Sequence, residues 1–143
     1  MHPRDVHHIG HAVVSLDAAI DTYARVLGAT VDHRETVPDQ GVEAAFLRLG
    51  RGRLELLAAL GPDTPVGRFL AKRGQGMHHV AYLVDDVQAA LDQARAAGAE
   101  LIDERPRPGL GGLEVAFVHP ESVHGVLVEF VQERDDGAAH EQQ

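Results

Sequence analysis

Two histidines and two glutamates occupy positions at which side chains of their types could bind a metal ion. His8 and His79 each stand second in a His-His pair that opens a strand-like run, and Glu55 and Glu129 each interrupt an apolar run. A carboxylate in such a run is costly to bury unless it is hydrogen-bonded, ion-paired or bound to a metal. Two neutral imidazoles and two carboxylates suit divalent Mn, Fe, Co, Ni or Zn better than Ca or Mg. The four residues therefore predict a metal site, in which an octahedral ion would keep two positions open for a substrate.

The strand pattern predicts which way these side chains face. In the first strand-like run, Ile9 and Val13 alternate with His8, so the imidazole is expected on the face opposite a covering helix. The run that contains His79 alternates in the same way. The runs RLELL and VLVEFV place apolar side chains on one face and a single carboxylate on the other. We therefore expect all four side chains to face one cleft.

The order of elements repeats along the chain. Four pairs of equivalent residues are separated by 70 to 74 positions: His8 and His79, Gly28 and Gly98, Phe46 and Phe117, Glu55 and Glu129. An internal repeat with constant spacing indicates that one supersecondary unit is present twice. The unit is a βαβββ module, because a strand-like run is followed by an amphipathic helix and then by three further strand-like runs.

The repeat predicts one α+β domain over 1–143, in which two paired modules form an open, curved eight-stranded sheet around the metal site. Module one spans 6–60, with strands at about 8–14, 30–36, 42–49 and 53–60 and a helix at 17–29. Module two spans 77–132, with strands at 78–84, 100–104, 113–119 and 125–131 and a helix at 86–99. A linking helix is expected within 62–74 and a frayed tail at 133–143.

Composition excludes several classes of partner. The net charge of −9 argues against a nucleic-acid binder, because phosphate neutralisation requires a basic face. No apolar run approaches the roughly 18 residues of a membrane span, and the start MHPRDVHH contains no signal-peptide core. The chain has no cysteine, which fits a reducing compartment. A cytoplasmic protein without nucleic-acid or membrane partners is expected.

Several segments resemble the methylmalonyl-CoA epimerase family of the vicinal oxygen chelate superfamily. They are HHIGHAV, DQGVEAAFLRLG, LELLAALGPDTPVGRFLAKRGQGMHHVAY and VAFVHPESVHGVLVEFVQ, and the resemblance extends over roughly residues 6–132. The resemblance implies the vicinal oxygen chelate fold, a homodimer and a divalent ion held by His8, Glu55, His79 and Glu129. Cobalt is typical of the family, and Mn²⁺, Ni²⁺ or Zn²⁺ are the alternatives. It also implies an isomerase that interconverts (2R)- and (2S)-methylmalonyl-CoA by removing and returning the C2 proton through a metal-stabilised enolate.

The chain departs from one pattern in that family, which has a non-ligand Glu three residues after the glycine of QGV and a Gln at the position of Glu55. Here Ala44 occupies the first place, and Glu43 is one residue away and expected to face outward. Epimerisation requires a proton acceptor on one side of C2 and a donor on the other. We therefore predict that Glu55 and Glu129 are the catalytic residues as well as metal ligands.

Three other functions fit parts of the same pattern. A glyoxalase I-like lyase acting on a glutathione hemithioacetal would use the same four ligands. An iron-dependent ring-cleaving dioxygenase uses two histidines and one carboxylate, so a fourth ligand argues against it. A binding module for an aromatic drug would need no metal, and four Phe, two Tyr and no Trp give it few stacking surfaces.

Overall fold

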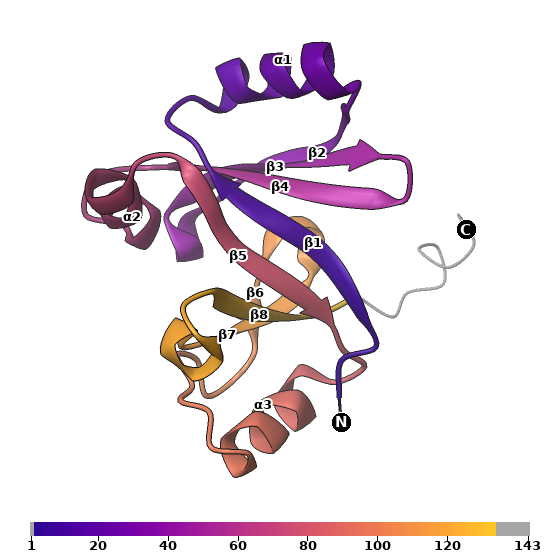
Figure 1. Cartoon of the computed structure of the whole chain (residues 1–143), viewed down its shortest axis with the longest axis vertical. Helices are drawn as coiled ribbons and strands as arrows, with labels where there is room; N and C mark the ends of the chain where they lie inside the picture. The colour runs from indigo at the N-terminus through magenta and orange to yellow at the C-terminus, as the bar shows by residue number, and fades with distance from the viewer. Residues whose placement is uncertain (1, 134–143) are drawn as a thin grey trace. The chain divides into compact units, whose positions relative to one another are not determined.

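The computed structural model describes residues 2–133, which form two compact units. The N-terminal unit contains residues 7–81, and the described part of the C-terminal unit contains residues 2–6 and 82–133. Three helices and eight strands follow one another in these residues, labelled in Figure 1. The tail predicted to be frayed, 133–143, lies outside the described residues from position 134 onward.

The N-terminal unit has the strand order β2-β3-β4-β1-β5. Its elements are β1 (Asp5–Ala12), α1 (Leu16–Leu27), β2 (Thr30–Val37), the 3-10 helix η1 (Pro38–Gln40), β3 (Val42–Leu49), β4 (Gly52–Ala59), α2 (Pro65–Arg73) and the larger part of β5 (Gly76–Leu83). β3 runs antiparallel to β2 and β4, and β1 runs parallel to β4. The parallel pair brings the strand that carries His8 beside the strand that carries Glu55.

Helix α1 covers one face of this sheet because its apolar stripe packs on the apolar side chains that β3 and β4 direct to that face. It begins after Ser15, whose hydroxyl accepts a hydrogen bond from the Ala18 N–H at 3.1 Å. It ends at Gly28, which adopts the left-handed conformation with φ 73°. The core beneath the helix consists of Val13, Leu16, Ala29, Ala45, Leu47, Leu56 and Ala58. The predicted helix side of the strands is therefore confirmed for Val13 and Leu56, which leaves His8 and Glu55 for the opposite face.

The C-terminal unit repeats this packing with α3 (Val87–Ala96) and the strand order β8-β7-β6. Its remaining elements are β6 (Arg107–Pro108), η2 (Leu110–Gly112), β7 (Glu114–Val118), η3 (Pro120–Val123) and β8 (Leu127–Gln132). The core beneath α3 consists of Val84, Val87, Ala90, Leu91, Ala116, Val118, Val128 and Phe130. Val128 and Phe130 flank Glu129 and point toward the helix, as the alternation predicts.

The strand predicted at 100–104 is wrong. Leu101 makes only an isolated bridge to Val118, and the edge strand is the two-residue β6 instead. The side chain of Asp103 accepts the Phe117 N–H at 2.9 Å, and the Phe117 carbonyl accepts the N–H groups of both Ile102 and Asp103. The Asp103 side chain thus takes the place of the backbone carbonyl that a neighbouring strand would supply as acceptor. Pro106 has no N–H, so it could not donate a hydrogen bond to continue the strand.

The helix expected between the modules is present as α2, and Thr64 organises its first turn. The Thr64 hydroxyl donates to the Gly61 carbonyl at 2.7 Å and accepts the Gly67 N–H at 3.0 Å. Pro65 follows at the first helical position, where its missing N–H costs no hydrogen bond. None of the helices in residues 2–133 has the length and apolar composition of a membrane span.

Replacing Thr64 with Ala removes both hydrogen bonds of the cap, so we expect the free energy of unfolding to fall by about 1 kcal/mol. Urea denaturation measures the change. Thr22→Ala is the matched control, because Thr22 is exposed within α1 and bonds only back to the Ala18 carbonyl in that helix. An equal loss in both variants would contradict the capping role of Thr64.

Candidate metal centre

Three of the predicted residues meet within the N-terminal unit. The Nε2 atom of His8 and the Nε2 atom of His79 each lie 3.1 Å from Oε1 of Glu55. The two Nε2 atoms are themselves 3.1 Å apart. Three possible ligand atoms thus form a nearly equilateral triangle, and these residues belong to a group of side chains that could hold a metal ion.

The size of the triangle matches a metal site. An octahedral ion with bonds of about 2.1 Å holds neighbouring ligand atoms about 3.0 Å apart. His8, Glu55 and His79 are 2 %, 6 % and 1 % exposed, so water can solvate these polar atoms only poorly. A buried set of two imidazole nitrogens and a carboxylate oxygen is the kind of ligand set that binds borderline divalent ions. The residues present therefore fit such an ion.

Backbone register and a glycine position the triangle. Gly10 of β1 lies opposite Glu55 of β4, and the imidazole of His79 occupies the space above Gly10. A Cβ atom on Gly10 would lie 2.1 Å from Cε1 of His79. No side chain other than hydrogen leaves room for that ring, so the type of residue 10 is fixed by the position of a ligand on another strand.

The charge state of Glu55 reflects two opposing effects. Burial alone would raise the pKa of its carboxyl group, because the charged form loses hydration. Hydrogen bonds from His79 and His8, together with the positive charge of protonated imidazoles, outweigh burial and lower the pKa well below its usual range. Glu55 is therefore a carboxylate at neutral pH, which is the form that ligates a metal ion.

An aromatic side chain forms one wall beside the triangle. Phe46 lies opposite Glu55 in the β3–β4 register, and its ring centroid is 5.0 Å from that of His8 in an edge arrangement. The C-terminal unit repeats the pairing, because Phe117 lies opposite Glu129 in the β7–β8 register. Glu129 is 4 % exposed. It thus occupies in its own unit the register position and the buried environment that Glu55 occupies in the other.

Glu43 lies away from the ligand cluster. Its carboxylate accepts hydrogen bonds from Arg34 at 3.1 and 3.2 Å, and Arg34 also binds Asp17. Ala44, by contrast, is completely buried. The strand alternation therefore turns Glu43 toward an ion pair on the surface, in agreement with the outward orientation expected from the sequence.

Two histidines outside the predicted set contact the imidazoles of His8 and His79. Nδ1 of His7 lies 2.7 Å from Nδ1 of His8, and Nδ1 of His78 lies 2.9 Å from Nδ1 of His79. Strand alternation predicts that consecutive side chains point to opposite faces, so it gives no reason to include them. The signal that could have found them is the repetition of the His-His pair itself.

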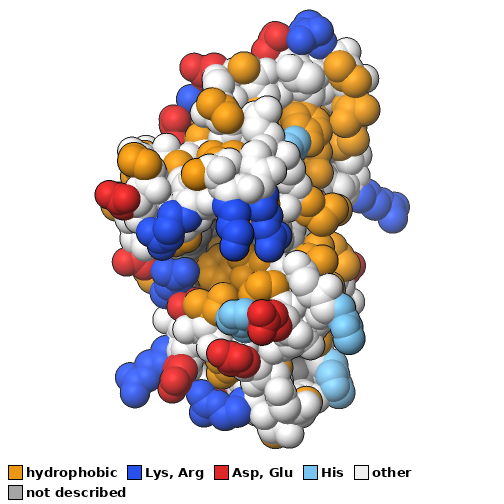
Figure 2. All heavy atoms as spheres, turned by 60° about the vertical axis from the view of Figure 1, so that its left-hand side comes forward, with side chains coloured by type: hydrophobic (Ala, Val, Ile, Leu, Met, Phe, Trp, Pro, Cys, Tyr) orange, Lys and Arg blue, Asp and Glu red, His pale blue; other side chains and the backbone are white. Residues whose placement is uncertain are grey.

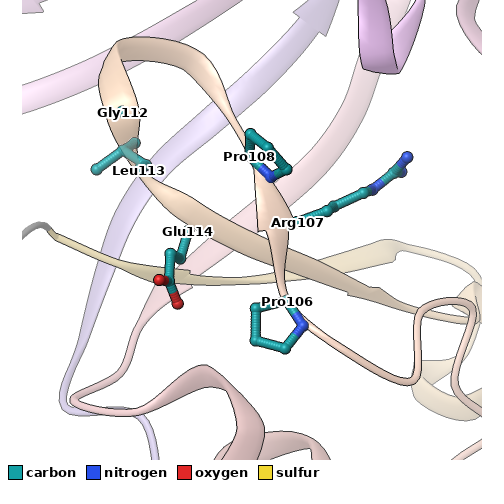
Figure 3. A pocket seen from close by; sticks show the side chains of 6 residues that line it. All are labelled: Pro106, Arg107, Pro108, Gly112, Leu113 and Glu114. Carbon is teal, nitrogen blue, oxygen red and sulfur yellow. The ribbon is translucent and has the colours of Figure 1, made fainter.

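Residues 106–108 and 112 of the segment RPRPGLGG (105–112), together with Leu113 and Glu114, line a cavity of about 360 Å³ in the C-terminal unit (Figure 3). The guanidinium carbon of Arg107 lies 5.4 Å from the centroid of the Phe117 ring, and its Nε atom lies 3.4 Å from Asp103. Figure 3 shows the Arg107 side chain directed away from Glu114. The segment continues into strand β7 and not into a helix. The segment therefore carries the Arg107 guanidinium, but it lacks the helix N-terminus of a phosphate-binding loop.

Comparison with known proteins places this geometry in a family. The model of the Glyoxalase/Bleomycin resistance protein/Dioxygenase superfamily matches residues 7–117. An ethylmalonyl-CoA/methylmalonyl-CoA epimerase of Cereibacter sphaeroides is 39% identical over 89% of this chain and 96% of that protein. The chain belongs to this superfamily and, within it, to the methylmalonyl-CoA epimerase family. The uncharacterized protein YqjC of Bacillus subtilis is 42% identical over 90% of this chain and 92% of that protein.

Solved structures of the family have the same fold. A methylmalonyl-CoA epimerase in complex with methylmalonyl-CoA and NH4+ superposes with a TM-score of 0.90 at 36% identity, covering 94% of this chain and 97% of that one. The predicted fold class, two βαβββ modules with the vicinal oxygen chelate fold, is confirmed. The probable lactoylglutathione lyase of Vibrio cholerae is a more distant relative, 27% identical over 94% of this chain and 97% of that protein.

Replacing Gly10 with Ala must displace the His79 ring, so we expect the affinity for Co²⁺ to fall by about tenfold or more. Titration calorimetry of the purified protein measures the change. Gly76→Ala is the matched control, since Gly76 lies on β5 and a Cβ there meets no atom within 4 Å. Unchanged Co²⁺ affinity in a folded Gly10→Ala protein would show that the His79 ring does not bind the ion.

Proposed function

We propose that the protein is a divalent-metal-dependent epimerase that interconverts (2R)- and (2S)-methylmalonyl-CoA. The observation that carries this proposal is the buried triangle of His8, Glu55 and His79, whose 3.1 Å edges fit an octahedral ion. The family to which the chain belongs includes epimerases of this substrate, among them the one from Cereibacter sphaeroides. An acyl-CoA thioester is therefore the substrate class.

Glu129 is the fourth ligand in this proposal. It is buried, carries a carboxylate, and shares with Glu55 the position opposite a phenylalanine in equivalent strand pairs. Two imidazoles and two carboxylates would then hold the ion, and a substrate that offers two oxygen atoms could bind to it beside them. Cobalt is the proposed ion, with Mn²⁺, Ni²⁺ or Zn²⁺ as alternatives that the same donor set accepts.

The reaction divides between the ion and two side chains. A divalent ion in this site supplies Lewis acidity to the thioester carbonyl and the free carboxylate of the substrate, which makes the C2–H bond easier to ionise. Glu55 and Glu129 are the proposed proton carriers on the two sides of C2. Hydrogen bonds from His8 and His79 lower the pKa of Glu55 against the effect of burial. With Nε2 of both rings turned to an ion, the rings would no longer donate to Glu55, and a Glu55 carboxylate away from the ion would be left with the burial that raises its pKa.

The protein is proposed to act as a cytoplasmic homodimer. Several apolar side chains are exposed on the N-terminal unit, including Val14 at 73 % and Val26 at 66 %. Figure 2 shows apolar side chains reaching the surface among charged ones on one face of the molecule. Covering such side chains in a subunit interface would remove apolar area from water.

A glyoxalase I-like lyase that acts on a glutathione hemithioacetal is the alternative. Its proton transfer could use the same two carboxylates, and the Vibrio cholerae relative carries a lyase name. The higher identity of the epimerases over nearly the whole chain favours the first proposal.

With Co²⁺ added, the protein is expected to exchange the C2 hydrogen of methylmalonyl-CoA with deuterium from solvent and to mix the two C2 configurations. Removing the ion with a chelator should abolish both effects. NMR of the acyl group follows the exchange, and the hemithioacetal of methylglyoxal and glutathione is the parallel substrate. Turnover of the hemithioacetal without C2 exchange would replace the epimerase proposal with the lyase.

Glu55→Gln and Glu129→Gln each remove a proton-carrying group while keeping an oxygen that can ligate. We expect each to lower kcat by about 10²-fold or more, because general acid–base catalysis contributes that much, with the ion retained. Glu43→Gln is the matched control, since Glu43 is held by Arg34. Full epimerase activity of metal-loaded Glu55→Gln would exclude Glu55 from proton transfer.

A further inference from the structure

Each imidazole proposed to ligate the metal has a second imidazole hydrogen-bonded to its far side. The His7–His8 pair lies on β1 and the His78–His79 pair on β5, and in both the contact joins Nδ1 to Nδ1, at 2.7 and 2.9 Å. Equivalent members of the two pairs are 71 positions apart in the sequence. The same unusual contact thus occurs twice, at the positions related by the internal repeat and within one compact unit.

A contact of this length between two ring nitrogens allows only one hydrogen. Two N–H groups would place their hydrogens against each other, and two bare nitrogens would place lone pair against lone pair. One nitrogen must therefore donate and the other accept. A neutral imidazole carries one hydrogen, so the nitrogen that donates at Nδ1 belongs to the ring whose Nε2 carries none.

The direction of the Nε2 atoms of His8 and His79 shows which rings donate. His8 and His79 direct Nε2 toward Glu55 and toward each other. A neutral imidazole that gives its Nε2 lone pair to a cation carries its hydrogen on Nδ1. That hydrogen then points at the neighbouring histidine, whose Nδ1 must be the acceptor and whose own hydrogen must be on Nε2.

We propose that His7 and His78 are positioning residues that accept the Nδ1–H of His8 and His79 and thereby hold both ligand rings in the tautomer that directs Nε2 to the metal ion. The inference rests on the proposed metal site and adds the groups that orient it. Most metal-bound histidines in proteins donate their second N–H to a carboxylate, a backbone carbonyl or water, and loss of that acceptor weakens metal binding about 10- to 100-fold. In this chain the acceptor is another imidazole at both positions.

Packing against a phenylalanine restrains both outer imidazoles. His7 is 7 % exposed and lies edge-on to Phe46, with ring centroids 6.1 Å apart. The His78 ring lies edge-on to Phe69 of α2, with centroids 5.0 Å apart. Each outer imidazole is thus packed against a phenylalanine, which restricts its rotation and keeps Nδ1 facing the ligand.

The tautomers can be read directly by NMR. In Zn²⁺-loaded protein with ¹⁵N-labelled histidine, long-range ¹H–¹⁵N spectra at neutral pH are expected to show His8 and His79 with hydrogen on Nδ1, and His7 and His78 with hydrogen on Nε2. Hydrogen on Nδ1 of His7 and His78 would overturn the proposal, because those atoms could then not accept.

Metal affinity gives an independent measurement. His7→Phe and His78→Phe keep a planar ring without an acceptor, and each is expected to weaken Co²⁺ binding about 10- to 100-fold in competition with a chromophoric chelator. His7→Asn, which offers a carbonyl oxygen near the position of Nδ1, should restore the affinity and the Co²⁺ absorption spectrum. His33→Phe is the matched control, because His33 pairs with Glu35 away from the ligands.

The outcomes separate this proposal from the one on which it rests. If the unaltered protein binds no Co²⁺ or Zn²⁺, the metal site itself is wrong. If it binds and both Phe variants bind equally well, the site stands and the positioning role is wrong. Should His7→Phe fail to fold, by circular dichroism of the metal-free protein, His78→Phe and the tautomers of the unaltered protein still decide the question.

Discussion

The structure depends on keeping a carboxylate buried among imidazoles. Glu55 is 6 % exposed in a strand whose other buried residues are apolar, and a lone carboxylate there would be strongly destabilising. Its partners His8 and His79 lie at 3.1 Å, and they come from two other strands. The fold must therefore hold β1, β4 and β5 in a fixed register, because only then do both imidazoles offset the cost of burying the Glu55 carboxylate. The parallel β1–β4 pair, which sets Gly10 opposite Glu55, is the part of the register that does this.

The same constraint explains several local features of the sequence. Position 10 must be glycine, because the His79 ring fills the space that a Cβ would occupy. Phe46 lies opposite Glu55 and packs edge-on against His8, so it limits access of water to the polar cluster. The helix side of the same strands is packed under α1 with small and branched apolar residues. In these strands, the side chains of one face pack in the core under α1 and those of the other face surround the polar cluster.

Duplication gives this arrangement a functional consequence. The proposed proton transfer on both sides of C2 needs two groups in comparable surroundings, and the repeated module offers Glu55 and Glu129 for it. Phe117 and Glu129 repeat the pairing of Phe46 and Glu55 in the second module. The His-His pair is also repeated, so each proposed ligand ring has its own hydrogen-bonding neighbour. Glu43, which faces the opposite side of its strand, is bound to Arg34 and stays away from the cluster.

The sequence by itself determined the two βαβββ modules, the face of each strand and the residues offered as ligands, because periodicity and repetition are properties of the chain. It also determined the end of α1 and the start of α2, where Gly28 and Thr64 act through neighbours only a few residues away. It failed at 100–104, since the Asp103 side chain competes there for the Phe117 N–H, and that contact spans 14 positions. Only the tertiary structure decided the 3.1 Å triangle and the His7–His8 and His78–His79 contacts. Those depend on strand register and ring rotation, which local patterns do not encode and which the packing of β1, β4 and β5 fixes.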